Sequence, residues 1–273
     1  MLNDGRLVSG SEGGKIIIHN KITYKPDLII TNKYNKVRSL MTLKSGVLAA
    51  CDEYYINFYN IKENKYEKLS IIDNNSRGYK LLELQNNYLV SIDYNALTFF
   101  FIDNLKYEKD FTNNGEYNSY SLIQTTSNEI CYYEYKNSKN NLCFFDLNER
   151  KVKSSIENID GCGSYGPFSM IKNNLLITSG KNKIYVINVL QYKIVRTVEV
   201  PYSTNIYGFC MINKNMFLIE DEKGAIIQCK MKGDNIIIIS KKEKCHDSSI
   251  RALINIGDGH IESGSCDKSI KIW

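Results

Sequence analysis

The feature that most constrains this chain is a repeat with a period of about 42 residues. Short runs of β-branched and aromatic residues recur along the chain, and each ends in an apolar or aromatic residue that Asn or Asp often follows. The equivalent end residues are His19, Tyr59, Phe101, Phe145, Ile187, Cys229 and Trp273. They are separated by 40, 42, 44, 42, 42 and 44 residues. Unrelated apolar runs would not keep such a step, so the sequence indicates seven copies of one structural unit.

Each unit has room for four short strands. In each unit a second predicted strand precedes the run that ends at the residues named above. The segments 5–14 and 259–268, which contain this strand in the first and last units, match almost position for position. A third lies further upstream, as at 37–43 and 250–256, and a more variable fourth, as at 193–200, lies between units. A β-sandwich gives no reason for a fixed period, and helical repeats would show a 3.6-residue period. The pattern therefore predicts an all-β, seven-bladed propeller of four-stranded antiparallel blades.

Composition favours one intracellular domain that spans residues 1–273. The chain has only 3 prolines and no Ser- or Gly-rich linker that would divide it. Its net charge of +5 is dispersed, so we expect no nucleic-acid partner. The longest apolar runs, such as 236–239, are too short to cross a bilayer, so we expect no membrane partner. We place the protein in the cytoplasm, and the sequence leaves the nucleus open.

The 8 cysteines form no CxxC pair and no cluster with histidine. A zinc site needs thiolates or imidazoles at short spacing, so we expect no metal and no cofactor. Most of the cysteines lie inside strand-like runs. They are interpreted as small buried apolar residues of a protein in a reducing compartment.

Residues 246–273, HDSSIRALINIGDGHIESGSCDKSIKIW, resemble a near-complete repeat of the WD-repeat family, in which His opens the repeat and Trp-Asp closes it. The resemblance implies a buried hydrogen-bonded chain of His246, Ser263, Asp267 and Trp273. Such a chain is physically reasonable, because a buried indole N–H and a buried imidazole both need partners. We expect Trp273 to be largely buried against its own blade.

The first repeat departs from this pattern. Its matching positions hold Ser9, Gly13 and His19, so we expect the hydrogen-bonded chain to be lost there. Other repeats keep fragments of it, such as Ser91 with Asn95.

A candidate partner-binding set comes from aligning the innermost strands. The position two places before a shared apolar residue holds Arg38, Tyr79, Tyr120, Gly166, Tyr207 and Arg251. In the WD-repeat family this position lies near the rim of the central channel, on a face commonly used for binding. Tyr and Arg anchor many interfaces, because they combine contact area with directed polar groups. The alternative is that each tyrosine simply packs against a neighbouring blade. Glu12, Asp52 and Glu222 fall on the same face, so its charge is mixed.

These features favour an interaction scaffold or adaptor that binds other proteins or peptide segments, and not an enzyme. His246, Ser263 and Asp267 are the residue types of a nucleophilic triad, but their spacing matches the structural chain, so we assign no catalytic residue. One alternative is a substrate receptor of a ubiquitin ligase, with Arg38 and Arg251 reading an acidic or phosphorylated segment. An alternative of another class is a propeller hydrolase or lyase. A carboxylate pair or metal-ligand cluster on the rim would favour it.

The first and last repeats are incomplete. Seven repeats of 42 residues need 7 × 42 = 294, and 294 − 273 leaves 21 missing, about two strands with their turns. The first repeat begins at its second strand and the last ends at its third. In most WD-repeat propellers one end of the chain supplies the missing strand of the other end's blade. We therefore expect a fragment of a longer chain, or a partner strand that completes the ring.

Overall fold

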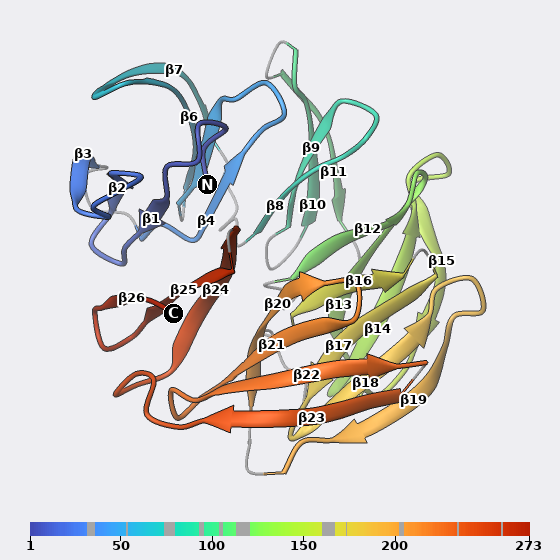
Figure 1. Cartoon of the computed structure of the whole chain (residues 1–273). Coiled ribbons are helices and arrows are strands. Elements are labelled where there is room, and N and C mark those ends of the chain that lie inside the picture. The colour runs from blue at the N-terminus through green and yellow to red at the C-terminus, as the bar shows by residue number, and fades with distance from the viewer. Residues whose placement is uncertain are drawn as a thin grey trace. The chain divides into compact units, whose positions relative to one another are not determined.

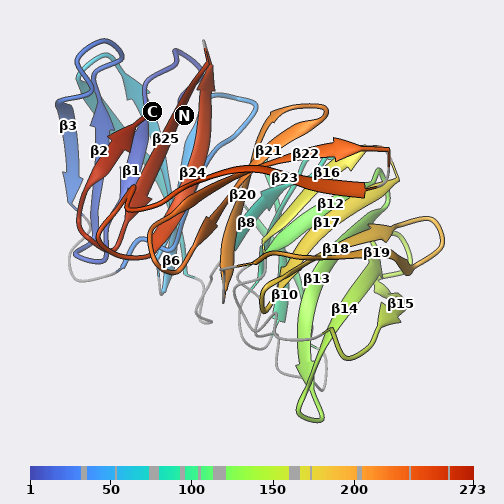
Figure 2. The same ribbon diagram turned by 60° about the horizontal axis from the view of Figure 1, so that its bottom comes forward.

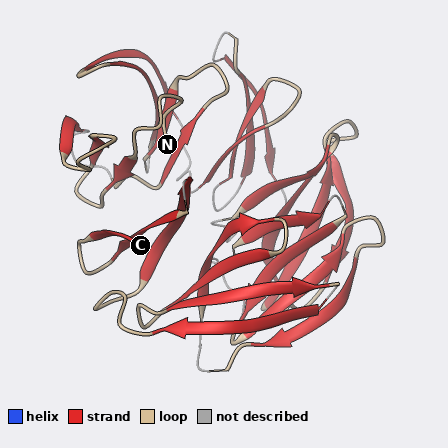
Figure 3. Ribbon diagram, in the orientation of Figure 1, coloured by secondary structure: helices blue, strands red, loops and turns tan. Residues whose placement is uncertain are grey.

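The computed structural model describes residues 1–31, 36–52, 54–73, 80–92, 96–103, 106–112, 121–159, 167–172, 174–201, 205–233, 235–257 and 259–273. Strands and loops make up all of these residues (Figure 3). The described strands form seven antiparallel sheets, five with four strands and two with three. The protein is thus an all-β, seven-bladed β-propeller, as the period predicts, and we number the sheets as blades 1 to 7 in chain order.

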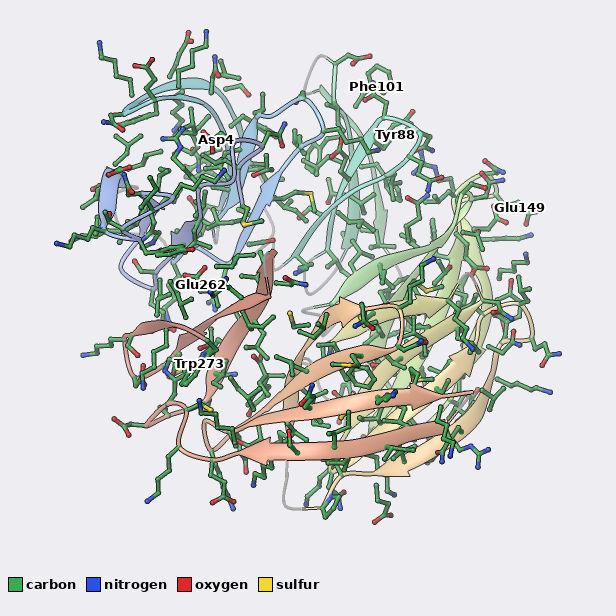
Figure 4. All side chains as sticks on the ribbon, viewed as in Figure 1. Asp4, Tyr88, Phe101, Glu149, Glu262 and Trp273 are labelled. Carbon is green, nitrogen blue, oxygen red and sulfur yellow. The ribbon has the colours of Figure 1, made fainter. Side chains whose placement is uncertain are left out.

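The strands group into two compact units, Met1–Leu122 and Ile123–Trp273. In the first unit, blade 1 has the order β1 (Val8–Gly10), β2 (Lys15–His19), β3 (Pro26–Thr31). Blade 2 has the order β4 (Ser39–Thr42), β5 (Leu48–Cys51), β6 (Tyr55–Lys62), β7 (Lys65–Asp73). Blade 3 runs in the same sense through β8 (Lys80–Glu83), β9 (Tyr88–Ile92), β10 (Ala96–Phe101) and β11 (Lys106–Thr112). In blade 3, Tyr88 pairs with Phe101, and their rings lie 5.4 Å apart (Figure 4).

The second unit holds the other four blades (Figure 1). Blade 4 begins with β12 (Leu122–Thr126), whose first residue ends the first unit, and continues with β13 (Glu129–Lys136), β14 (Lys139–Asp146) and β15 (Lys151–Ile156). Blade 5 consists of β16 (Phe168–Lys172), β17 (Leu175–Gly180), β18 (Lys183–Asn188) and β19 (Lys193–Glu199). Blade 6 consists of β20 (Ile206–Asn213), β21 (Met216–Asp221), β22 (Ile226–Lys232) and β23 (Asn235–Lys242). Blade 7 consists of β24 (Ile250–Gly257), β25 (His260–Ser265) and β26 (Ile270–Ile272).

Blades 1 and 7 each show three strands in the described residues. The β1 strand of blade 1 is the predicted second strand, and the β26 strand of blade 7 is the predicted third. Both blades therefore match the expectation of incomplete first and last repeats.

The hydrophobic core lies between neighbouring blades. In the second unit, Tyr133 and Phe144 of blade 4 pack in one cluster with Leu176 and Ile187 of blade 5. Each middle strand faces a neighbour on both sides, so β17 is buried along its whole length. The outer strand β15 instead alternates exposed and half-buried residues. This arrangement explains why the middle strands read as continuous apolar runs and the outer ones vary.

The Asn or Asp that follows the predicted third strand has a structural role. In the turns to the outer strands, one side-chain oxygen of Asn20, Asp146 or Asn188 accepts hydrogen bonds from the backbone N–H groups two and three residues later. These six hydrogen bonds measure 2.9 to 3.1 Å. Such Asx turns stabilise a tight hairpin locally. The sequence motif therefore marks the turn that separates the third strand from the fourth.

Candidate functional site

The structure brings together two of the candidate partner-binding residues, Tyr207 and Arg251. Tyr207 lies in β20 and Arg251 in β24, the first strands of blades 6 and 7, which run beside each other (Figure 2). Arg38 lies just before β4 in the first unit. Tyr79 and Tyr120 lie outside the described residues.

Arg251 and Tyr207 form a stacked cation–aromatic pair. The guanidinium carbon of Arg251 lies 4.4 Å from the ring centroid of Tyr207. The Nε–H of Arg251 donates to the sulfur of Cys266, 3.3 Å away in the turn between β25 and β26. Arg251 is exposed and Tyr207 is half-buried. We call Tyr207, Arg251 and Cys266 the Arg251 cluster. It presents a cation whose position is fixed by an aromatic ring and a thiol.

The surroundings of the Arg251 cluster carry both signs of charge. Glu222 follows β21, and its side chain accepts a 2.6 Å hydrogen bond from Asn205. The Ser249 hydroxyl donates to the backbone carbonyl of Glu222 at 3.1 Å and so joins blade 7 to blade 6. Lys223 and Lys268 are exposed in the turns after β21 and β25. The surface around the cluster therefore carries both acidic and basic side chains, as the sequence indicates.

Glu220 on β21 is a buried acid near the Arg251 cluster that no sequence motif indicates. Glu220 is 0% exposed, and among the residues that the structure describes neither of its carboxyl oxygens has a hydrogen-bond partner. Burial raises the pKa of Glu220 to about 8, and the charge of Arg251 only partly opposes this shift. Gly208 on β20 provides the space, because a Cβ there would lie 2.5 Å from the Oε1 of Glu220. The signal in the sequence is an acid that directly follows the apolar residues 217–219 within a predicted strand.

His246, Ser263, Asp267 and Trp273 lie in one hydrogen-bonded chain in blade 7. The Nε1–H of Trp273 donates to the hydroxyl of Ser263 at 2.8 Å. That hydroxyl lies 2.7 Å from the Nε2 of His246, and the Nδ1 of His246 lies 2.8 Å from Asp267. Because the carboxylate can only accept, the protons point from Trp273 through Ser263 and His246 towards Asp267.

The burial of this chain is graded. Ser263 is 0% and His246 1% exposed, while Asp267 and Trp273 are half-buried. Trp273 packs against the buried cluster of Ile226, Cys245 and Ile250 and keeps part of its ring accessible. The Nζ of Lys242 lies 4.4 Å from the indole centroid and covers part of the ring with a flexible side chain.

The backbone of His246 lies in close contact with the backbone of Gly224. Its N–H donates to the carbonyl of Gly224 at 3.0 Å. Gly224 has a φ of +79°, and a Cβ there would lie 2.3 Å from the backbone oxygen of His246. Only glycine fits both the left-handed conformation and this approach. The turn of blade 6 thereby fixes where the polar chain of blade 7 begins.

Blade 1 corrects the expectation that the polar chain is lost there. The Nε2 of His19, at the position of Trp273, lies 2.8 Å from the hydroxyl of Ser9, at the position of Ser263. The Nδ1 of His19 lies 3.1 Å from the backbone oxygen of Tyr24. His19 is 7% exposed, so these bonds satisfy a buried imidazole. Blade 1 keeps one link of the chain because imidazole, like indole, can bond a hydroxyl. Asn95, the expected partner of Ser91 in blade 3, lies outside the described residues.

Arg38 lies beside a capped turn in blade 2. Its backbone N–H donates to the carbonyl of Cys51 at 2.8 Å. The carboxylate of Asp52 accepts from the N–H groups of Tyr54 and Tyr55, both at 2.8 Å. Arg38 is half-buried, and Tyr54 is 49% exposed.

The described cysteines are reduced, with Cys266 exposed and the others buried, and Cys162 lies outside the described residues. In the described part of the chain, no three His, Cys, Asp or Glu side chains are grouped to hold a metal ion. No helix among the described residues is long and apolar enough to cross a membrane.

Comparisons with known proteins give a match at the level of fold. No protein-family model and no curated protein sequence matches the chain. Among solved structures, that of Raptor from Chaetomium thermophilum matches with a TM-score of 0.80 over 99% of this chain. The two share a fold. Their sequences are 13% identical, and the match covers 26% of the Raptor chain, so this chain spans about a quarter of that length.

Proposed function

We propose that the chain is a WD-repeat propeller that acts as an intracellular scaffold, and that the Arg251 cluster binds segments of partner proteins. The observation that carries the proposal is the exposed guanidinium of Arg251, stacked 4.4 Å from Tyr207. A cation held in this way loses less side-chain entropy on binding than a freely rotating lysine would. Arg and Tyr are also enriched among the residues that contribute most to binding at protein interfaces.

The guanidinium favours one class of partner segment, an acidic or phosphorylated one. Its fork of N–H donors matches the oxygens of a carboxylate or phosphate group. This is the recognition expected of a substrate receptor in a ubiquitin ligase, which we keep as the narrower form of the proposal. The acid Glu222 and the cation Lys223 beside the cluster would then favour some acidic segments over others.

The polar chain of blade 7 supports a binding role over a catalytic one. Ser263 is 0% exposed, and its hydroxyl is engaged by both Trp273 and His246. A nucleophile must reach a substrate, whereas this hydroxyl links two side chains within a blade. The same groups that resemble a triad therefore serve to fix the packing of the blade.

The test is capture of partners from the source cells with the purified chain as bait. We expect Arg251→Ala and Tyr207→Ala each to reduce the recovery of specific partners at least fivefold, about 1 kcal/mol of binding free energy. Lys214→Ala is the matched control, because it removes an exposed cation from the turn at the other end of β20. Circular dichroism and thermal unfolding check that each variant is folded.

Combining Arg38→Ala with Arg251→Ala tests whether the two arginines belong to one binding surface. Full recovery of partners by the Arg251→Ala protein would contradict the proposal. Equal losses with Lys214→Ala would show a general charge effect instead.

A further inference from the structure

The layer between blades 6 and 7 contains a charged residue that the proposed binding role does not use. Glu220 comes from β21 and is directed to the blade 7 side, because its neighbours Ile219 and Asp221 alternate to the other face. Ile219 belongs to the core shared with blade 5, and Leu218 packs with Trp273 in the cluster next to blade 7. β21 lies beside β24, the strand of Arg251, and the charge of Arg251 acts on the carboxyl group of Glu220.

The groups that face Glu220 come from three strands and one turn. β20 contributes Cys210, whose pKa is raised to about 11 by burial and further by the charge of Glu220, and it contributes Tyr207 through its contact with Arg251. β24 contributes Arg251, whose charge acts on Glu220. From β22, the residue paired with Glu220 is the apolar Ile226. The β25–β26 turn contributes Cys266 through its contact with Arg251.

We propose that Glu220 regulates the Arg251 cluster through its own protonation: the ionised carboxylate competes with an oxyanion of a partner for the guanidinium, and the neutral acid does not. This inference rests on the proposed function for its biological meaning. Its physical content concerns only Glu220, Arg251 and an anion.

Three observations support this assignment. The carboxyl group is fully buried, with no hydrogen bond to either oxygen, so no other described donor stabilises its ionised form. Gly208 leaves the space that the carboxyl group fills on the β20 side, and the cation whose charge acts on Glu220 is Arg251. Burial places the pKa of Glu220 at about 8, so its charge changes over a range in which Arg251 stays protonated.

Proton and anion binding must then be coupled in both directions. An anion that binds better when Glu220 is protonated must itself raise the pKa of Glu220 by the same free energy. For a coupling of about tenfold in affinity, saturation with the anion moves the titration midpoint by about one pH unit.

The experiment follows the Cζ resonance of Arg251, which needs no exchangeable proton, by carbon-13 NMR in the full chain. Sulfate is the probe, because it stays a dianion between pH 6 and 9.5. We expect the resonance to shift with a midpoint near pH 8. We also expect the dissociation constant for sulfate to rise about tenfold between pH 6.5 and 9.5. Glu220→Gln, which keeps the shape of the neutral acid, should abolish the step and keep tight sulfate binding at both pH values.

Glu222→Gln is the matched control, because it removes the charge of a nearby half-buried acid that is hydrogen-bonded to Asn205, and it should leave the step in place. A resonance that does not change between pH 6 and 9.5 would overturn the inference, as would equal sulfate affinity at both ends of the range. If Glu220→Gln does not fold, the wild-type chain still tests the inference. Saturating sulfate must then raise the pH midpoint of the Arg251 resonance, and an unchanged midpoint would overturn the inference.

The two proposals fail separately. If Arg251→Ala retains every partner while the NMR step is present, the proposed function fails and the coupling stands. If Arg251→Ala loses its partners while the resonance ignores pH, the coupling fails and the binding role stands.

Discussion

His19 in blade 1 stands in the same relation to Ser9 as Trp273 in blade 7 does to Ser263. Both ring nitrogens lie 2.8 Å from a serine hydroxyl. The direction of the bond differs, however. The indole of Trp273 can only donate, whereas the Nδ1 of His19 faces the carbonyl of Tyr24 and must donate there, so the Nε2 of a neutral His19 accepts from Ser9. The same position in two blades thus keeps a buried ring–hydroxyl bond with the donor and acceptor exchanged.

This relation predicts the effect of removing the hydroxyl of Ser9. Ser9→Ala leaves the nearly buried Nε2 of His19 without a partner, so it should lower the free energy of unfolding by about 1–2 kcal/mol. Urea denaturation followed by circular dichroism measures the change. Ser127→Ala, in an exposed turn of blade 4, should change stability by less than about 0.5 kcal/mol. Equal effects of the two substitutions would show that the bond contributes nothing.

The polar chain of blade 7 predicts a loss of stability in acid. Hydrogen bonds from Ser269 and His246 hold the pKa of Asp267 well below its ordinary value. A depressed pKa means that the folded state binds this proton less readily than the unfolded state. The stabilisation is therefore complete above pH 4 and is lost as the pH falls further.

We expect Asp267→Asn to lower the melting temperature at pH 6 and to weaken its decline below pH 4. Thermal unfolding followed by circular dichroism between pH 2.5 and 6 makes the comparison. Asp247→Asn changes an exposed neighbour and should behave as the wild type. If the melting temperatures of the wild type and of Asp267→Asn fall in parallel as the pH decreases, ionised Asp267 does not stabilise the fold.

Glu220 predicts a pH dependence of the opposite sign. Burial raises the pKa of Glu220 to about 8, above the ordinary value of 4.5. Folding then takes up a proton between these values, so the favourable contribution is complete below pH 4.5 and is lost as the pH rises to 8. We expect the melting temperature of the wild type to fall more steeply across this window than that of Glu220→Gln. Calorimetry at pH 5, 6.5 and 8 decides, and profiles of equal slope would contradict the burial of an ionisable acid.

The sequence predicts the blades well because their determinants are local. The third strands, their end residues such as Phe145, and the Asn or Asp of the following turn all lie within a few residues of one another. Glu220 could not be found in this way. Its environment depends on a register irregularity between Ile206 and Phe209 in the facing strand, on the missing side chain of Gly208, and on Arg251 from another blade. None of these contacts follows a period.

The chemistry of His19 was missed for a related reason. A comparison of aligned positions treats His19 as the loss of a tryptophan, whereas the fold requires only a ring nitrogen that can bond the hydroxyl of Ser9. The repeat fixes the position of the side chain, and several residue types can meet its hydrogen-bonding requirement. A search for the same residue type at each repeat position is therefore stricter than the hydrogen-bonding requirement of the fold.

The contact between Gly208 and Glu220 predicts a non-additive pair of substitutions. A Cβ at position 208 would lie 2.5 Å from the Oε1 of Glu220, so Gly208→Ala must displace a fully buried carboxyl group. We expect this substitution to cost about 1–3 kcal/mol in the wild-type chain, the usual range for overpacking. In a Glu220→Ala background the obstructing atoms are gone, and Gly208→Ala should cost about 1 kcal/mol less.

Urea denaturation of the wild type, both single variants and the double variant gives the coupling energy. Gly264→Ala is the control for placing a methyl group on a strand glycine, because a Cβ there meets no atom within 4 Å. Its cost should not depend on residue 220. If the Gly208 and Glu220 substitutions add within about 0.5 kcal/mol, the carboxyl group does not occupy the space that Gly208 leaves, and the proposed regulation of Arg251 by Glu220 loses one of its supporting observations.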